Sequence, residues 1–501
     1  MHLRIRSRTD LEALARANHF TLADGEAAVF GRMINQILLS YQRLDAIAES
    51  NKPDKHARGR GHFPRRKENP FGAWAWKCSI KATKTGQLAG KKIAIKDHVS
   101  VAGIPMVNGS PLLEKFIPDE DATVVKRILE AGGEIVGKSR CENLCVSGGS
   151  HTSYPEPVRN PRNRDYMAGG SSSGSAALLA SGEVDMAIGG DQGGSIRIPA
   201  SWCGVVGLKP TWGLVPYTGA FPLERTIDHL GPMANSVEAV ALLLEAIAGR
   251  DGLDTRQGET PSKLPRYSRN LRAGAKGLKI GVVKEGFAWE GLSEKDVDET
   301  VKQAASSFKE LGAAVNLVSI PEHRDGFHVW TGITIEGTWN TVVRDNGLEH
   351  TGAGGGNPHL VESWAKTRKA RSDELPPTMK LITLAGNYMG EKYNGRYFAL
   401  AQNLRRWLKR IYDRALSKYD LLLMPTTPQK AQPLGNMGLE EYLDATLLNL
   451  YNTCPFDVSG HPAISIPCGT SGGLPVGLML VGMHFEESSV LRAAFALEQT
   501  S

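Results

Sequence analysis

From about residue 86 onward, short apolar segments alternate with segments of helical period. Each apolar segment is long enough for a strand, and Gly132 and Gly133 stand where glycine commonly ends a helix. Strands that alternate with helices predict an α/β fold, and a chain of 501 residues is long enough to bury a large core. The expected strands are 92–95, 134–137, 186–188, 278–283, 314–318, 421–424, 463–466 and 478–481, and the expected helices include 123–131 and 174–180.

The first part of the chain has a different pattern. Between residues 26 and 48, apolar side chains recur at steps of three and four, which predicts one apolar stripe along a long helix. Together with the segment 11–17, this stripe predicts an N-terminal helical extension over residues 1–85. The stripe can pack on the core of the extension itself or against another chain.

Two turns rich in glycine and serine lie 24 residues apart, and Lys96 stands upstream of both at the end of an apolar run. Such a turn alone is typical of a linker or a phosphate cradle, but neither turn has the closing Gly-Lys-Ser/Thr of a Walker loop. A serine nucleophile needs a base, and a lysine can serve when desolvation or a neighbouring cation keeps it neutral. The lysine and the serines Ser171 and Ser195 therefore indicate a hydrolase.

The order and spacing of several further motifs narrow this prediction. They are Lys96, Gly170-Ser171-Ser172, Asp191-x-Gly193-Gly194-Ser195-Ile196-Arg197-x-Pro199-Ala200, Cys203-Gly204-x-x-Gly207-Leu208-Lys209-Pro210-Thr211 and Pro455-Phe456-Asp457-x-x-Gly460-x-Pro462-Ala463. This order resembles the amidase signature family of Ser-cisSer-Lys hydrolases, from about residue 86 to the C-terminus. Within the family, the sequence is most similar to the bacterial amidases that accompany nitrile hydratases, through Cys141-Glu142-x-x-Cys145 and the pair Asp191-Gln192.

The resemblance implies a fold and a site. The fold is a large mixed β-sheet flanked by helices over residues 86–501. Between about 320 and 440 the alternating pattern loosens, and this variable region is expected to supply the pocket walls. Ser195 is expected as the nucleophile, Ser171 as the bridging serine after a non-proline cis peptide, and Lys96 as the terminal base. The expected oxyanion hole consists of the backbone N–H groups of Gln192, Gly193, Gly194 and Ser195. No metal and no organic cofactor are expected.

The resemblance also implies a reaction, the hydrolysis of small aliphatic or aromatic carboxamides to carboxylic acid and ammonia through an acyl-enzyme on Ser195. Two alternatives stay open. The same triad can hydrolyse anilides, carbamates or hydrazides, and the chain can be the amidase subunit of an aminoacyl-tRNA amidotransferase. In the nitrile-pathway relatives an N-terminal extension takes part in dimerisation, so a homodimer is expected here.

Several residues near these motifs have simpler interpretations. Asp191 and Arg197 flank the nucleophile and are expected to hold its loop through hydrogen bonds and charge. Asp97 can tune Lys96 or cap the loop that follows it. His151 is expected to be a hydrogen-bonded structural histidine, because the thirteen histidines show no metal-like or triad spacing.

Composition excludes some classes of partner. The chain has 59 basic and 53 acidic side chains and a net charge of +6, which is too small for a whole-molecule attraction to nucleic acid. The first residues lack the apolar core of a secretory signal, and no apolar stretch is long enough to span a bilayer. Six cysteines without zinc-like spacing are expected to be reduced thiols. We therefore expect a cytoplasmic protein that acts on a small-molecule amide.

Overall fold

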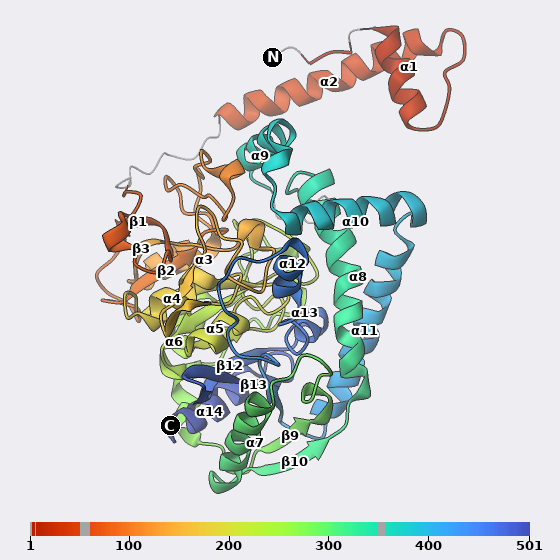
Figure 1. Ribbon diagram of the computed structural model, residues 1–501. Helices are drawn as coiled ribbons and strands as arrows, with labels where there is room; N and C mark the ends of the chain where they lie inside the picture. Colours follow the sequence, from red (N-terminus) through yellow and green to blue (C-terminus); the bar gives the residue numbers. More distant parts are fainter. Residues whose placement is uncertain (1–2, 6, 51–60, 349–355, 501) are drawn as a thin grey trace. The chain divides into compact units, whose positions relative to one another are not determined.

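Eleven strands form one mixed β-sheet in the larger part of the chain (Figure 1). The strands of the structure are β1 (Trp74–Ile80), β2 (Lys92–Lys96), β3 (Glu134–Ser139), β4 (Arg159–Asn160), β5 (Asn163–Met167), β6 (Met186–Asp191), β7 (Val206–Lys209), β8 (His229–Ala234), β9 (Lys279–Val283), β10 (Ala314–Val318), β11 (Leu421–Pro425), β12 (Ala463–Ser471) and β13 (Leu474–Gly482). Their order across the large sheet is β1-β3-β2-β6-β8-β7-β12-β13-β11-β9-β10, and β4 and β5 form a separate pair. This computed structural model describes residues 3–5, 7–50, 61–348 and 356–500.

Helices pack against the sheet along its length, with α4 on β6 and β2, α5 on β12 and β13, and α14 on β12. The helices are α1 (Arg8–Ala17), α2 (Glu26–Ser50), α3 (Thr123–Glu130), α4 (Ser173–Ala180), α5 (Arg197–Cys203), α6 (Val237–Ile247), α7 (Lys295–Glu310), α8 (Gly326–Thr338), α9 (Pro358–Ala370), α10 (Pro377–Tyr393), α11 (Arg396–Leu416), α12 (Leu439–Leu447), α13 (Cys454–Ser459) and α14 (Glu487–Glu498). Within the described ranges, none of these helices combines the length and the apolar character that a bilayer span requires.

The strands that position the functional motifs lie inside the sheet. β2 and β6 pair in parallel, with Ile93 opposite Met186 and Ile95 opposite Ile188. Every residue of β6 is buried, as expected for a strand covered on both faces. Because parallel strands end at the same edge of a sheet, Lys96 at the end of β2 lies beside the loop that follows β6.

The predicted α/β fold, with its large mixed sheet and flanking helices, is confirmed. The predicted strands at 92–95, 134–137, 186–188 and from 278 onward occur within a few residues of their expected bounds. Three strands of the large sheet were not predicted, namely β1, β7 and β8. β7 and β8 are four and six residues long and contain glycine or proline, so neither stands out as an apolar run.

The N-terminal part consists of α1 and α2, and α2 confirms the helix predicted over 26–48. The chain divides into the units Met1–Ala57 and Arg58–Ser501. This division lies before the expected boundary at residue 85, because β1 pairs with β3 as the edge strand of the sheet. Residues 51–60 of the expected extension lie outside the described residues. Within the stripe of α2, Phe30, Met33, Ile37, Tyr41 and Leu44 are exposed.

Candidate functional site

Lys96 is the last residue of β2, and its whole side chain is buried. Its Nζ donates a hydrogen bond of 2.8 Å to Oγ of Ser171 and one of 3.0 Å to the carbonyl oxygen of Gly190. The backbone of Lys96 pairs with Ser139 of β3, and the preceding Ile95 pairs with Ile188 of β6. The lysine therefore reaches one serine from a rigid strand end.

Ser171 lies just before α4, and the peptide bond between Gly170 and Ser171 is cis. A Cβ atom at position 170 would lie 2.2 Å from the carbonyl oxygen of Gly149, so only glycine fits there. The main-chain N–H of Ser172 donates to the carbonyl oxygen of Ser195 at 3.1 Å. This bond joins the turn of Ser171 to the turn of Ser195.

Ser195 lies between the end of β6 and the start of α5, and it lines a cavity of about 190 Å³. The residue is nearly buried, with 5% of its surface exposed. The structure thus brings Lys96, Ser171 and Ser195 to one edge of the sheet, although the first and last are 99 residues apart in the sequence (195 − 96). A nucleophile, a bridging hydroxyl and an amine are the groups that an acyl-transfer site needs.

The carbonyl groups of the loop before Ser195 are held from outside the loop. Nε1 of Trp330, on α8, donates to the carbonyl oxygen of Gln192 at 2.7 Å, and Oγ1 of Thr453 donates to that of Gly193 at 2.6 Å. In a trans peptide the C=O and the following N–H point in opposite directions. The N–H of Gly193 is therefore turned away from the indole of Trp330.

One of the four expected oxyanion donors has another partner. The N–H of Gly194 donates to Oδ1 of Asp191 at 2.6 Å. A single N–H makes one good hydrogen bond, so in this structure Gly194 holds the loop and does not offer a free donor. Among the described residues, the N–H groups of Gln192, Gly193 and Ser195 take part in no hydrogen bond.

Asp191 and Arg197 hold the loop that carries Ser195, as predicted from the sequence. Asp191 accepts from the N–H of Ile196 at 3.0 Å, and Arg197 contacts Asp191 at 3.0 Å and Asp457 at 2.7 Å. Burial opposes ionisation of Asp191, but the Arg197 guanidinium outweighs it and keeps the pKa of Asp191 below its usual range. Burial and the charge of Asp191 raise the pKa of Asp457, because one guanidinium serves both carboxyl groups.

Asp97 caps the loop that follows β2. Its Oδ2 accepts from the N–H groups of Val107 and Asn108 at 3.0 and 2.9 Å, and its Oδ1 lies 2.9 Å from Nζ of Lys138. Both charged side chains of this ion pair are buried. The role of Lys138 was not predicted, because this lysine lies within a strand and belongs to no recognisable motif. The pair fixes the backbone directly after Lys96.

Glu142 is a second residue whose role the sequence did not indicate. Its buried carboxylate accepts from the N–H and Oγ1 of Thr152 at 2.9 and 2.6 Å, and from Oγ of Ser173 at 2.8 Å; Ser153 also donates to it. Burial raises the pKa of Glu142, although these hydrogen bonds oppose the increase. Ser173 is the first residue of α4 and lies two residues after Ser171. Its hydroxyl ties the turn of Ser171 to Glu142.

The neighbouring histidine and cysteines have structural roles. Nε2 of His151 lies 2.9 Å from the carbonyl oxygen of Tyr442, and burial lowers the pKa of His151 to about 4. Cys141 and Cys145 are free and buried, and both donate to Oδ1 of Asn108, at 3.5 and 3.4 Å. The hydrogen bond of His151 agrees with the structural role predicted for it.

The cavity beside Ser195 has mostly apolar walls. They come from the loop at 145–148, from α8, α10 and α12, and from the loop that carries Ser195. Part of the expected variable region, 349–355, lies outside the described residues, and part of the wall comes from beyond residue 440. The lining residues are Cys145, Val146, Ser147, Gly148, Gln192, Gly193, Ser195, Leu223, Phe327, Trp330, Thr331, Thr334, Ile335, Thr338, Thr378, Leu381, Ile382, Leu443, Thr446, Leu447 and Leu450.

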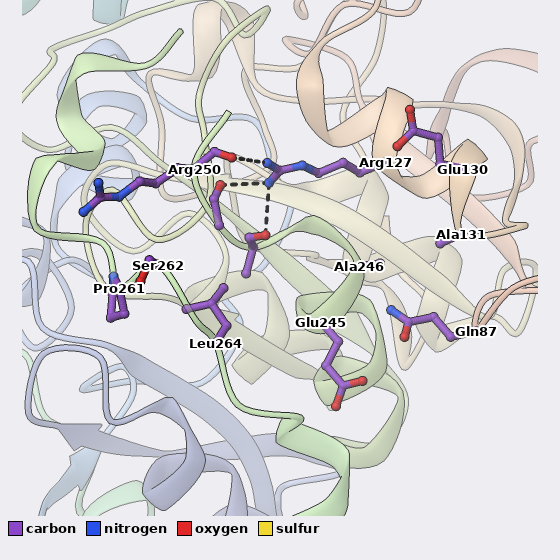
Figure 2. A pocket seen from close by; sticks show the side chains of 12 residues that line it. Gln87, Arg127, Glu130, Ala131, Glu245, Ala246, Arg250, Pro261, Ser262 and Leu264 are labelled. Carbon is purple, nitrogen blue, oxygen red and sulfur yellow. Dashed lines mark hydrogen bonds between the residues drawn. The ribbon is translucent and has the colours of Figure 1, made fainter. Parts of the chain in front are cut away.

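A larger hollow of about 660 Å³ lies elsewhere in the same unit (Figure 2). One of the residues that line it, Arg127, points toward main-chain carbonyl groups near the end of α6. The guanidinium donates to the carbonyl oxygens of Ala248, Gly249 and Arg250, as Figure 2 shows. It also donates to the carbonyl oxygen of Ile247. Terminal carbonyl groups of a helix need such partners. Arg127 thus caps a helix, and neither Ser171 nor Ser195 lines this hollow.

Comparisons with known proteins agree with this geometry. Residues 73–491 match the family described as Amidase. The chain is 46% identical to an enantioselective amidase of Rhodococcus rhodochrous, with 86% of this chain and 84% of that protein covered. It is 38% identical to a subunit of the glutamyl-tRNA(Gln) amidotransferase of Methanosarcina mazei, covering 83% of this chain and 85% of that protein. The solved structure of native peptide amidase from Stenotrophomonas maltophilia superposes with a TM-score of 0.69 at 28% identity, covering 83% of each chain. The chain belongs to the amidase family.

Proposed function

We propose that this protein hydrolyses small carboxamides to carboxylic acid and ammonia through an acyl-enzyme on Ser195. The observation that carries the proposal is the buried contact of 2.8 Å between Nζ of Lys96 and Oγ of Ser171, beside the cavity that Ser195 lines. An amine, a bridging hydroxyl and a nucleophilic hydroxyl at a cavity of this kind support acyl transfer without a histidine.

In the first step, Oγ of Ser195 attacks the amide carbon of the substrate. Its proton passes to Ser171, whose own proton passes to the amine of Lys96. A lysine accepts a proton only in its neutral form, so the step starts from molecules in which this amine is uncharged. The proton then returns along the same path to the leaving nitrogen, and ammonia departs.

Negative charge develops on the carbonyl oxygen of the substrate in this step. We infer that the N–H groups of Gln192, Gly193 and Ser195 receive it, since Gly194 donates to Asp191. Such donors stabilise the transition state strongly because they are fixed before the reaction begins. The bonds from Trp330 and Thr453 to the loop carbonyls support this arrangement.

In the second half of the reaction, water attacks the acyl-enzyme. Lys96 and Ser171 now take a proton from the water and return it to Ser195, which restores the starting state and releases the carboxylic acid. The cavity of about 190 Å³ with aliphatic and aromatic walls supports a small apolar acyl group, aliphatic or aromatic.

Two related activities use the same three residues. Anilides, carbamates and hydrazides differ from primary amides mainly in the leaving group, so the triad alone does not separate them. The match to one subunit of an amidotransferase favours glutamine as a second candidate substrate, with ammonia passed to a partner protein. Glutaminase activity that depends on partner subunits distinguishes this second function from the first.

We further propose that the chain forms a homodimer in the cytoplasm. The exposed stripe on α2, from Phe30 to Leu44, supports this assembly, because a long row of exposed apolar side chains is costly in water. A second copy of the same helix offers a matching apolar face. The free cysteines support a reducing compartment.

The test is product release from propionamide, benzamide, acetanilide, ethyl carbamate and glutamine. Wild-type chain is compared with Ser195→Ala and with Ser306→Ala, a change of an exposed serine on α7. Turnover of simple amides that is lost in Ser195→Ala and kept in Ser306→Ala supports the proposal. Turnover of glutamine alone, and only with partner subunits, supports the amidotransferase function instead. Undiminished turnover in Ser195→Ala refutes the acyl-enzyme on this residue.

A further inference from the structure

Three side chains with metal-binding chemistry meet away from Ser195. Asp413 lies in α11, His461 lies just before β12 and His484 lies just after β13. One ligand atom from each lies within 4.8 Å of the other two. Nε2 of His461 is 3.1 Å from Oδ1 of Asp413, and Nδ1 of His484 is 3.9 Å from the same oxygen.

The two imidazole rings are oriented by one residue, Ser459, at the end of α13. Nε2 of His484 lies 3.1 Å from the carbonyl oxygen of Ser459, which can only accept, so Nε2 carries the proton and Nδ1 keeps a lone pair. Nδ1 of His461 lies 3.0 Å from Oγ of Ser459. Metal-binding histidines commonly have their second ring nitrogen held by such a main-chain or side-chain group.

Among the described residues, no group donates a hydrogen bond to the lone pair on Nδ1 of His484. This nitrogen is buried, and it faces the carboxylate of Asp413 and the ring of His461. A buried nitrogen without a partner costs free energy unless another group satisfies it. This orphan atom is the second, independent sign that the cluster takes a ligand.

We propose that Asp413, His461 and His484 bind a divalent transition-metal ion of the Zn²⁺ class. Imidazole nitrogen and carboxylate oxygen are ligands that this class prefers, and three protein ligands leave a fourth position for water. The three ligands belong to α11 and to segments adjoining β12 and β13, so a bound ion joins the helix to the sheet.

Binding needs a change of tautomer in His461. In the metal-free protein the contact with the carboxylate of Asp413 places the ring proton of His461 on Nε2. On metal binding this proton moves to Nδ1, where Oγ of Ser459 accepts it, and Nε2 becomes a ligand. The ring stays neutral throughout.

The surroundings determine the exposure of the cluster and limit its affinity. The Asp413 side chain is 31% exposed and that of His484 is 15% exposed, so the cluster lies close to the surface. Nζ of Lys409 lies 2.9 Å from Oδ2 of Asp413, the carboxylate oxygen that does not face the histidines. This positive charge weakens the attraction for a cation, although it leaves Oδ1 available.

The experiment measures Zn²⁺ bound to the untagged full-length chain after removal of metal with EDTA and equilibrium dialysis. Co²⁺, which absorbs visible light when tetrahedrally bound, serves as a second probe. Wild type is expected to bind one equivalent more than Asp413→Asn or His484→Gln. Ser459→Ala, which removes the hydroxyl partner of His461, is expected to lower affinity by about tenfold or more.

The matched control is His62→Ala, which removes a half-exposed histidine paired with Glu68 and should leave the metal content unchanged. If circular dichroism shows that His484→Gln is unfolded, Asp413→Asn decides, because it keeps the shape of a partly exposed side chain. Equal Zn²⁺ binding by wild type and Asp413→Asn overturns the proposal. Metal binding retained in Ser195→Ala separates this result from any result on amide hydrolysis.

Discussion

The indole Nε1 of Trp330 donates to the carbonyl oxygen of Gln192 over 2.7 Å, and this bond links α8 to the loop that carries Ser195. The same tryptophan lines the cavity beside Ser195. A Cβ atom at position 193 would lie 2.9 Å from the indole ring, so the ring packs directly on Gly193. Trp330 thus forms part of the pocket wall and fixes the adjoining peptide.

Replacing Trp330 by Phe tests this link. The ring contact is largely kept, but the N–H donor is lost and the peptide before Gly193 is free to turn. We expect kcat on a simple amide to fall by about tenfold, which is less than the roughly 10²–10³-fold fall typical when an oxyanion donor itself is removed. Trp364→Phe removes an equivalent indole bond to the carbonyl oxygen of Val342 and is the control. A similar loss in both variants would contradict a specific role for Trp330.

Removal of the Lys96 amine is expected to stop the proposed proton relay. Lys96→Met keeps much of the volume of the side chain but cannot accept a proton from Ser171. We expect kcat to fall by about 10²–10⁴-fold, the range for a lost general base. Steady-state kinetics on benzamide provide the measurement, and Lys92→Met, at the exposed start of the same strand, is the control. Near-normal turnover in Lys96→Met would rule out the relay.

Arg197 holds two buried carboxyl groups, so its removal should destabilise the fold. Arg197→Met leaves Asp191 and Asp457 without their cation, and loss of one partner of a buried ion pair costs about 3–5 kcal/mol. Urea unfolding followed by circular dichroism measures the change in the free energy of unfolding. Arg371→Met removes a surface ion pair with Glu374 and should have a much smaller effect. Equal losses in the two variants would show that the buried network is not a special source of stability.

The buried Lys209 predicts a pH dependence of stability. Burial lowers its pKa to about 7, whereas an unfolded lysine has a pKa of about 10.4. Between these values the unfolded chain binds one proton more than the folded chain. The contribution of Lys209 to the free energy of unfolding therefore rises with pH, by about 1.4 kcal/mol per pH unit, between about pH 7 and pH 10.

Urea unfolding of wild type and Lys209→Met across this range isolates that contribution, because the other titrating groups are common to both proteins. The difference in unfolding free energy, wild type minus variant, should increase with pH. Lys115→Met, a change of an exposed lysine, should give parallel curves with wild type. A constant difference between wild type and Lys209→Met would show that Lys209 titrates at its ordinary value in the fold.

Local patterns were sufficient for much of the fold. The strand at 314–318 is a short apolar run, and the helix over 123–131 has an apolar stripe. Each pattern is complete within a few residues, so these elements can be placed without knowledge of the rest of the chain. The edge strand β1 was not predicted. It is specified by pairing with β3 and not by its own pattern, since its residues are mostly half-buried.

For the site, short motifs were enough to name the residues expected to carry the chemistry. Lys96, Ser171 and Ser195 follow from glycine-rich turns and from an apolar strand before the lysine, which are features of short segments. How these residues are held depends on long-range packing. Lys138, Glu142, Trp330, Thr453 and Asp457 each lie more than 30 residues from a group that they position. Such contacts arise where distant segments pack together, and they leave no periodic signal in the chain.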